Sequence, residues 1–313
     1  MPADPKTAVL LMAYGSAPTT KKADVRAYLT HILQFYRRTN PTDDEIKHLQ
    51  ARYKAVGGSP LYDVTGRTVA AVQRALDLAF PDMYDVVMAM KHSPPHVEDV
   101  VRALAGRGVH RGIAVALAPF RSRLSTEGYY KLVREVNEGL ETPMEWRFAP
   151  DWHLHPLFLE LWHRRIDDAL ASVPEREPWV IFTNHSLPAR IQDGSDPYPA
   201  QFEATARALA ERCGARSWSF AYQSAGGGNV PWLGPALGDV LARQIGNGGK
   251  DVLVAPIGFL MDHLEVLYDL DVAARRAAEE LDVRLHRTRM PNDDPLLVAL
   301  LADVVRTAGR SKK

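Results

Sequence analysis

Short apolar runs alternate along this chain with longer amphipathic segments. The runs read as strands, and most are continuously apolar, which is typical of a parallel sheet covered by helices on both faces. Segments such as "TGRTVAAVQRALDLAF" and "LFLELWHRRIDDALASV" instead carry apolar residues three and four positions apart, which indicates helices. This alternation predicts a doubly wound α/β fold. The six expected strands are "AVLLMAYG", "DVVMAMKH", "GIAVALAP", "WVIFTNHS", "SWSFAYQS" and "DVLVAPIGF".

The series of elements begins twice, at "AVLLMAYG" and again at "WVIFTNHS", with "FAPDWHLHP" between the two halves. We therefore expect two similar α/β lobes with a cleft between them. The N-terminal lobe would span residues 1–152 and be joined by a C-terminal helix over 293–313, and the second lobe would span 153–292. A chain of 313 residues is long enough for two domains of ordinary size.

Composition narrows the classes of function. Lys plus Arg equals Asp plus Glu at 38 each, so the chain lacks the basic excess of a nucleic-acid binder. The single cysteine, Cys213, excludes a disulfide within the chain. It also argues against a cysteine-ligated zinc or iron–sulfur site, and we expect a partly buried structural residue. No apolar run approaches the roughly 20 residues of a spanning helix, so we expect a cytoplasmic protein with no integral membrane segment.

Polar residues follow the apolar runs where an α/β sheet binds its ligands, beyond the carboxyl ends of the strands. These are Tyr14-Gly15, Lys91-His92, Asn184-His185, Gln223-Ser224 and the stretch 258–271. His185 is either a strand-end imidazole that hydrogen-bonds its loop or, paired with Glu265, a metal ligand or base near neutral pH.

The stretch 258–271 allows two interpretations. If a helix begins near Asp262, then Asp262, Glu265 and Asp269 share one face at about 100° per residue. With His263 beside them, they could relay protons or bind a cation. Alternatively, Asp262 and Glu265 form a capping box at the start of the helix.

Several motifs together resemble the ferrochelatases. They are "LLMAYGS", "ARYKAVGGSPL", "KHSPPHVEDV", "TNHSLP", "DPYPAQ", "PWLGP", "GFLMDHLEVLYD" and "MPND", and the resemblance covers residues 8 to 305. The chain is most similar to the soluble Gram-positive type, which inserts ferrous iron into coproporphyrin III. The resemblance implies two Rossmann-like lobes around a porphyrin cleft, with Fe(II) as a substrate. It also implies no permanently bound cofactor and no iron–sulfur cluster.

The resemblance assigns roles to residues on the two faces of the macrocycle. His185 matches the histidine that binds the metal and accepts protons, and Glu265 matches its partner carboxylate. Tyr14 matches a tyrosine that reaches the metal from the opposite face. Asp269 and Asp271 continue an acidic ladder after Glu265, which implies a proton relay.

Other matched positions would hold the porphyrin. Arg52, Ser59 and Tyr129 match positions that hold the propionates, and the cleft would be lined by Lys91, His92 and Trp232. The chain departs from the family at "HILQFYRRTNP", where Arg37 and Arg38 stand as displaced substitutes for an arginine-rich turn. The "GGSPL" motif is one residue short, and Ala273 replaces an acid of the ladder.

The expected function is insertion of ferrous iron into a porphyrin in haem biosynthesis, with coproporphyrin III converted to coprohaem III. One alternative is a protoporphyrin IX ferrochelatase, and another is a non-catalytic carrier of haem or porphyrin. The expected partners are the porphyrin and ferrous iron, without nucleic acid. We expect a monomer that contacts neighbouring haem-pathway enzymes transiently.

Overall fold

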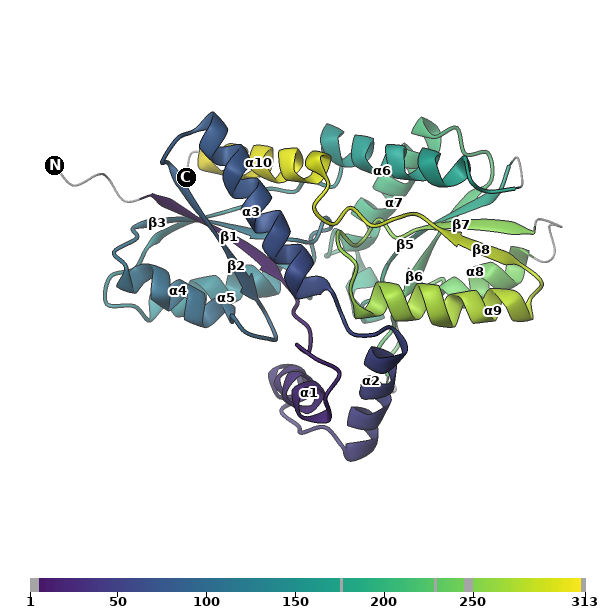
Figure 1. The fold of residues 1–313 in the computed structure, drawn as a ribbon, viewed down its shortest axis with the longest axis horizontal. Coiled ribbons are helices and arrows are strands. Elements are labelled where there is room, and N and C mark those ends of the chain that lie inside the picture. The colour runs from purple at the N-terminus through teal and green to yellow at the C-terminus, as the bar shows by residue number, and fades with distance from the viewer. Residues whose placement is uncertain (1–5, 175–176, 228–229, 245–249, 311–313) are drawn as a thin grey trace.

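The computed structural model describes residues 6–174, 177–227, 230–244 and 250–310. Two parallel four-stranded sheets form two lobes side by side (Figure 1). The first sheet has the order β2-β1-β3-β4, from β1 (Thr7–Ala13), β2 (Tyr84–Met90), β3 (Arg111–Ala116) and β4 (Glu145–Phe148). The second has the order β6-β5-β7-β8, from β5 (Trp179–His185), β6 (Trp218–Gln223), β7 (Asp251–Ala255) and β8 (Arg284–Arg287).

The two sheets share one topology, because the first strand of each lobe lies between the second and the third. This confirms the predicted α/β class and all six expected strands. The pattern missed β4 ("EWRF") and β8 ("RLHR"), which contain few apolar residues. Both are four-residue edge strands held by parallel pairing to β3 and β7, respectively, and not by an apolar run of their own.

Helices flank both sheets. The first lobe contains α3 (Leu61–Ala79), α4 (Val97–Gly106) and α5 (Thr126–Glu138), and the second contains α6 (Pro156–Leu170), α7 (Tyr198–Arg212), α8 (Leu237–Gln244) and α9 (Arg275–Glu280). A 3-10 turn covers Ala189–Asp193, and a π-helix (Val266–Ala274) runs directly into α9. The pair α1 (Lys22–Arg37) and α2 (Asp43–Ala55) projects beneath the two lobes (Figure 1).

Helix α2 begins at a capping box, which fixes its direction. The Thr42 hydroxyl accepts a hydrogen bond from the Glu45 amide at 3.2 Å, and the Glu45 carboxylate accepts one from the Thr42 amide at 2.7 Å. Two N–H groups at the helix start, those of Thr42 and Glu45, are thereby paired. The fixed direction of α2 carries Arg52 and Tyr53 to its far end, next to the second lobe.

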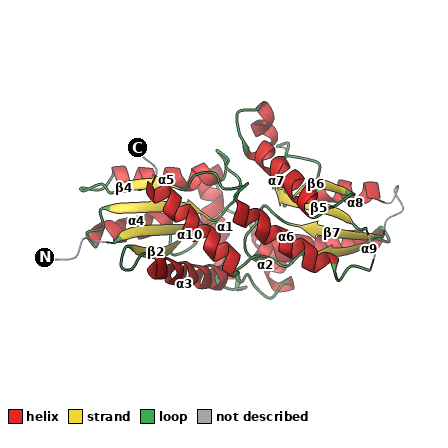
Figure 2. Ribbon diagram, turned by 90° about the horizontal axis from the view of Figure 1, so that it is seen from above, coloured by secondary structure: helices red, strands yellow, loops and turns green. Residues whose placement is uncertain are grey.

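Helix α10 (Pro295–Arg310) joins the lobes. It packs along α3 and α6, as the view from above shows (Figure 2), and buries Leu297, Leu301 and Val305 completely. One continuous hydrophobic core includes strand residues of both lobes, such as Val9 and Val180. The division into domains at residue 152 therefore stays a prediction. Within the described ranges, no helix has the length and apolar character needed to cross a membrane.

Candidate active site

His185 ends β5 and presents one ring nitrogen to the site. Its Nδ1 lies against the Ser186 carbonyl. A carbonyl only accepts hydrogen bonds, so Nδ1 carries the proton, and Nε2 is the nitrogen with a lone pair in the neutral ring. Nε2 lies 3.4 Å from the Glu265 carboxylate, and the two side chains are 31 % and 34 % exposed. The strand therefore delivers a partly exposed base next to an acid.

The backbone around His185 is held by Asn184. The His185 amide donates to Asn184 Oδ1 at 2.8 Å, and the Tyr198 hydroxyl donates to the same oxygen at 2.8 Å. Gly258, after β7, passes so close that a Cβ there would lie 1.9 Å from this oxygen. Only glycine allows this approach without displacement, so the position of His185 depends on a residue from a neighbouring strand end.

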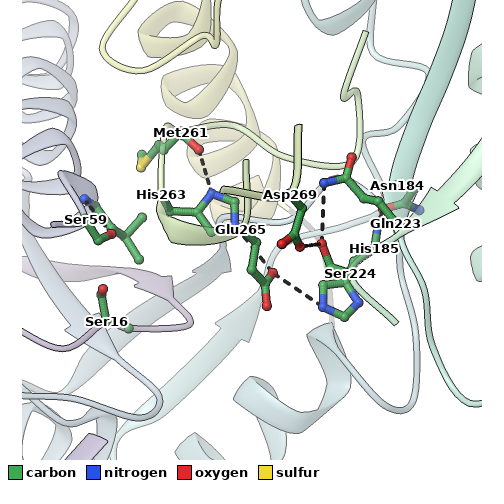
Figure 3. A network of polar contacts seen from close by, with 12 residues as sticks. Ser16, Ser59, Asn184, His185, Gln223, Ser224, Met261, His263, Glu265 and Asp269 are labelled. Carbon is green, nitrogen blue, oxygen red and sulfur yellow. Dashed lines mark hydrogen bonds and ion pairs between the residues drawn. The ribbon is translucent and has the colours of Figure 1, made fainter. Parts of the chain in front are cut away.

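Glu265 is shared by two imidazoles. His263 Nδ1 donates to the Met261 carbonyl at 2.9 Å, and its Nε2 lies 3.6 Å from the same Glu265 oxygen that faces His185 (Figure 3). Burial opposes ionisation of Glu265, but the charges and hydrogen bonds of His185 and His263 outweigh it and hold the pKa of Glu265 well below its usual range. Burial likewise lowers the pKa of His185, yet the charge of Glu265 outweighs this and the net shift is upward.

Asp269 extends this cluster along the π-helix. It accepts hydrogen bonds from Ser224, after β6, and from Arg52 of α2. Burial raises the pKa of Asp269, the nearby Glu265 charge adds to the rise, and the Ser224 and Arg52 contacts only partly oppose it. Three elements distant in sequence therefore meet at one carboxylate, which lies four residues from Glu265.

The helix begins at Leu264, two residues after Asp262. After Glu265 it continues as the π-helix Val266–Ala274, so the assumption of 100° per residue does not hold. Asp262 forms no capping box and instead accepts from Asn292 Nδ2 at 2.8 Å, with Arg287 at 3.6 Å. Asp271 forms a bidentate ion pair with Arg287, with both contacts at 2.7 Å. These two acids are therefore engaged away from the His185–Glu265 pair.

Comparison with known proteins identifies the fold and the family. The Ferrochelatase family model matches residues 6–309. The chain belongs to the ferrochelatase family. The Ferrochelatase of Herpetosiphon aurantiacus is 41% identical over 308 residues, which cover 96% of this chain and 98% of that protein. The Coproporphyrin III ferrochelatase of Geobacillus thermodenitrificans is 37% identical, covering 95% of this chain and 94% of that protein.

Solved chelatase structures share the fold. SirB from Bacillus subtilis, solved with Fe3+, aligns at a TM-score of 0.59 and 12% identity, over 97% of this chain and 96% of that one. CbiX, the terminal enzyme of sirohaem biosynthesis in denitrifying bacteria, aligns at a TM-score of 0.53 and 11% identity over 97% of this chain and 99% of that one. As a member of the ferrochelatase family, the protein is an enzyme that inserts a metal ion into a porphyrin.

The first lobe contributes an aromatic and basic cluster. Tyr14 follows β1, is 40 % exposed, and its ring meets the edge of the His92 ring at 4.6 Å between centroids. Lys91 is only 2 % exposed and donates to the Tyr36 hydroxyl at 3.0 Å. Burial lowers the pKa of Lys91 to about 8, and burial with the neighbouring cations lowers that of His92 to about 2. His92 is therefore a neutral ring at physiological pH.

The remaining predicted residues are more scattered. Tyr129 is buried on α5, with Lys91 Nζ 5.2 Å above its ring. Ser59 precedes α3 and accepts from the Leu61 amide at 3.5 Å. Trp232 pairs with Pro188 in an isolated antiparallel bridge, so it lies beside the loop that follows His185. The side chains of three further residues are exposed: Arg37, Arg38 and Ala273.

Two cavities border the Lys91 cluster. The larger, of 480 Å³, is lined by cationic side chains of the β3–α5 region, including Arg121, Arg123, Lys131 and Arg134. The smaller, of 200 Å³, shares Arg123 and Lys131 with it and reaches Lys91. Neither of these two cavities is lined by His185 or Glu265. The first lobe therefore presents a basic rim.

Sequence reasoning indicated His263 beside the acids and Ser224 at a strand end, but it missed Tyr36 and the close approach of Gly258. His263 had a signal, because it lies two positions before Glu265 in the same motif. Ser224 also had one, since it follows β6 at the carboxyl end of the sheet. Tyr36 and Gly258 act through contacts across the fold, at Lys91 and Asn184, which no local pattern encodes.

Proposed function

We propose that this protein inserts ferrous iron into coproporphyrin III to give coprohaem III. The observation that carries the proposal is Nε2 of His185, which faces Glu265 at 3.4 Å in a partly exposed site. The choice of coproporphyrin draws on relatives named Coproporphyrin III ferrochelatase, which are 37% identical in Geobacillus thermodenitrificans and 33% identical in Listeria monocytogenes.

The reaction replaces two pyrrole protons by one Fe²⁺ ion, so two protons must leave for each turnover. Neutral His185 accepts the first at Nε2, since Nδ1 is occupied with the Ser186 carbonyl. The imidazolium formed is stabilised by the carboxylate of Glu265 at 3.4 Å. Imidazole and carboxylate are also suitable ligands for ferrous iron while it loses water, so His185 and Glu265 would hold the ion first, and Nε2 would accept a proton once the ion has passed to the pyrrole nitrogens.

Asp269 is the next acceptor in our proposal. Its raised pKa makes it a better proton acceptor than an ordinary aspartate, and its Ser224 hydrogen bond fixes the orientation of the carboxylate. His263, on the other side of Glu265, offers a parallel acceptor. We place Asp271 outside the route, because its bidentate pair with Arg287 occupies both carboxylate oxygens.

The tyrosine face would hold the other side of the macrocycle. Tyr14 is exposed and carries a hydroxyl suited to an axial contact with iron, while buried His92 supports its ring from behind. His92 stays neutral, so its role is packing rather than proton transfer. Lys91 is mostly protonated at neutral pH and supplies positive charge beneath this face.

A substrate with four propionates suits the basic rim. Arg123 and Lys131 line both cavities. Lys131 forms an exposed ion pair with Glu135 at 3.4 Å. Arg123 forms ion pairs with Asp193 at 3.8 Å and Asp196 at 3.7 Å, and it donates a hydrogen bond to the Ser195 hydroxyl at 2.5 Å. Propionates can replace the exposed pairs at little cost. Arg52 is also a candidate for binding a propionate. Because it already binds Asp269, it would contact both the substrate and the proposed proton relay. Tyr129 and Ser59 would contribute hydroxyl donors, and Trp232 an apolar wall.

The test is anaerobic metallation followed by absorbance. Purified protein is mixed with ferrous iron and either coproporphyrin III or protoporphyrin IX at equal concentration. We expect multiple turnovers and a kcat/KM at least tenfold higher with coproporphyrin III. A preference for protoporphyrin IX would keep the enzyme and refute the proposed substrate. Stoichiometric binding of both porphyrins without turnover would instead identify a carrier.

A further inference from the structure

The one cysteine of the chain lies in a cluster of metal-ligating side chains in the second lobe. Cys213 caps the end of α7, and its Sγ lies 3.3 Å from Nδ1 of His163 on α6. Nε2 of His163 lies 3.5 Å from the carboxylate of Asp167, one turn further along α6. Among the residues that the structure describes, this is the group of three or more such side chains whose ligand atoms all lie within 4.8 Å of one another.

The spacing of these atoms fits a bound cation. A tetrahedral zinc ion has a Zn–S bond of about 2.3 Å and a Zn–N bond of about 2.0 Å, which separates sulfur from nitrogen by about 3.5 Å. The Cys213–His163 separation of 3.3 Å is close to that value. His163 and Asp167 are four residues apart on one helix, which places both on the same face. Asp167 faces Nε2 of His163, whereas Cys213 faces Nδ1. Asp167 is 52 % exposed, so its carboxylate can turn toward an ion held by Nδ1 and Cys213.

The same three residue types could instead form a nucleophilic triad, with His163 between the thiol and the carboxylate. The two arrangements differ in whether a bound cation covers the Cys213 sulfur, which protection of the thiol from alkylation distinguishes. A divalent cation that displaces the thiol proton would neutralise the thiolate and the carboxylate together.

The neighbouring charged side chains do not block cation binding at the Cys213–His163–Asp167 cluster. Glu160, one turn before His163, is bound by Arg164 at 2.6 Å and also by Arg212. Its carboxylate is therefore neutralised and does not compete for the ion. His163 is 26 % exposed, so a cation reaches the cluster from solvent and keeps a water as its fourth ligand.

We propose that Cys213, His163 and Asp167 bind a divalent cation of the zinc type, through one thiolate, one imidazole and one carboxylate. Binding releases the thiol proton to solvent. The site belongs to the outer side of α6 and α7 and shares no residue with the His185–Glu265 pair. It revises the expectation that a single cysteine argues against any cysteine-ligated zinc site.

The test uses Co²⁺ as a spectroscopic probe on the full chain. Because Cys213 is the one cysteine in the sequence, a thiolate-to-cobalt charge-transfer band in the near ultraviolet reports this site alone. We expect one equivalent of Co²⁺ to produce the band and Zn²⁺ to abolish it. Cys213→Ser should lose the band and keep wild-type iron insertion, while Asp167→Asn should weaken Co²⁺ binding at least tenfold. His185→Ala should keep the band.

Two controls make the result decisive. Asp168→Asn changes the adjacent exposed carboxylate of α6 and should leave Co²⁺ affinity unchanged. In the unmodified protein, Zn²⁺ should slow alkylation of Cys213 by iodoacetamide at least tenfold, which needs no variant. Absence of the band overturns the site, as does a band whose cobalt affinity is equal in wild type and Asp167→Asn. Rapid alkylation unaffected by Zn²⁺ would favour the nucleophilic triad.

Discussion

The contact between Gly258 and Asn184 makes a sharp prediction for Gly258→Ala. The added methyl would lie 1.9 Å from Asn184 Oδ1 and 2.8 Å from Asn184 Cα. To reach the 3.4 Å of an ordinary contact, the side-chain oxygen and the methyl must separate by about 1.5 Å. Asn184 is 1 % exposed and lies between packed strands, so the shift is transmitted to its neighbours.

The expected loss of unfolding free energy follows from the hydrogen bonds that Asn184 accepts. Its oxygen accepts from the His185 amide and from the Tyr198 hydroxyl, each at 2.8 Å. Overpacking costs about 1–3 kcal/mol, and each weakened hydrogen bond costs about 1 kcal/mol. We expect Gly258→Ala to lose about 3 kcal/mol of unfolding free energy. Displacing His185, the proposed base, by about 1 Å should lower kcat roughly 100-fold.

The assay is urea unfolding together with anaerobic iron insertion. Gly66→Ala is the matched control, since Gly66 lies inside α3 and its Cβ would meet nothing within 4 Å. That substitution should leave kcat unchanged and stabilise the protein by up to about 1 kcal/mol through helix propensity. If Gly258→Ala keeps wild-type stability and kcat, the dependence of His185 on this contact is refuted.

Three further predictions concern charged groups. Glu265→Gln removes the charge that raises the pKa of His185. We therefore expect a lower kcat and an acid limb of the kcat/KM–pH profile that moves to lower pH. An acid limb at the wild-type pH would exclude His185 as the titrating base. Burial lowers the pKa of Lys91 to about 8, so between pH 8 and pH 10 this amine binds fewer protons in the folded state than in the unfolded state. The free energy of unfolding of the wild type, relative to that of Lys91→Met, should therefore increase from pH 8 to pH 10. A difference in urea unfolding that stays constant over this range would contradict the prediction. Asp271→Asn should lower the free energy of unfolding by about 2–3 kcal/mol and leave kcat unchanged. Asp269→Asn should lower kcat at least tenfold. A loss of kcat in Asp271→Asn but not in Asp269→Asn would restore the relay role of Asp271.

The strands and strand-end residues that depend on a local sequence pattern could be predicted from the sequence. The central strands β1 and β5 are buried on both faces, so their continuous apolar runs identified them. The carboxyl-end rule then placed His185 at the edge where Glu265 also lies. Strand β8 was missed, because "RLHR" has one apolar residue and its pairing to β7 is a backbone property.

Pairings across the fold could not be predicted. Arg52 meets Asp269 from 217 residues away, and nothing near either residue in the sequence specifies that contact. The π-helix was missed for a different reason: apolar spacing at three and four residues does not distinguish it from an α-helix, although it changes which acids share a face. The sequence therefore indicated the acids around Glu265, but it did not indicate that Asp262 contacts Asn292 or that Asp271 pairs with Arg287.

The most direct test of the account is single-turnover and multiple-turnover metallation of coproporphyrin III by wild type and His185→Ala, with porphyrin binding measured separately by fluorescence quenching. We predict that the variant binds coproporphyrin III within about threefold of wild type and loses at least 1,000-fold in kcat, because the acceptor of the pyrrole protons is gone. Turnover by His185→Ala within tenfold of wild type would contradict the assignment of His185 as that acceptor.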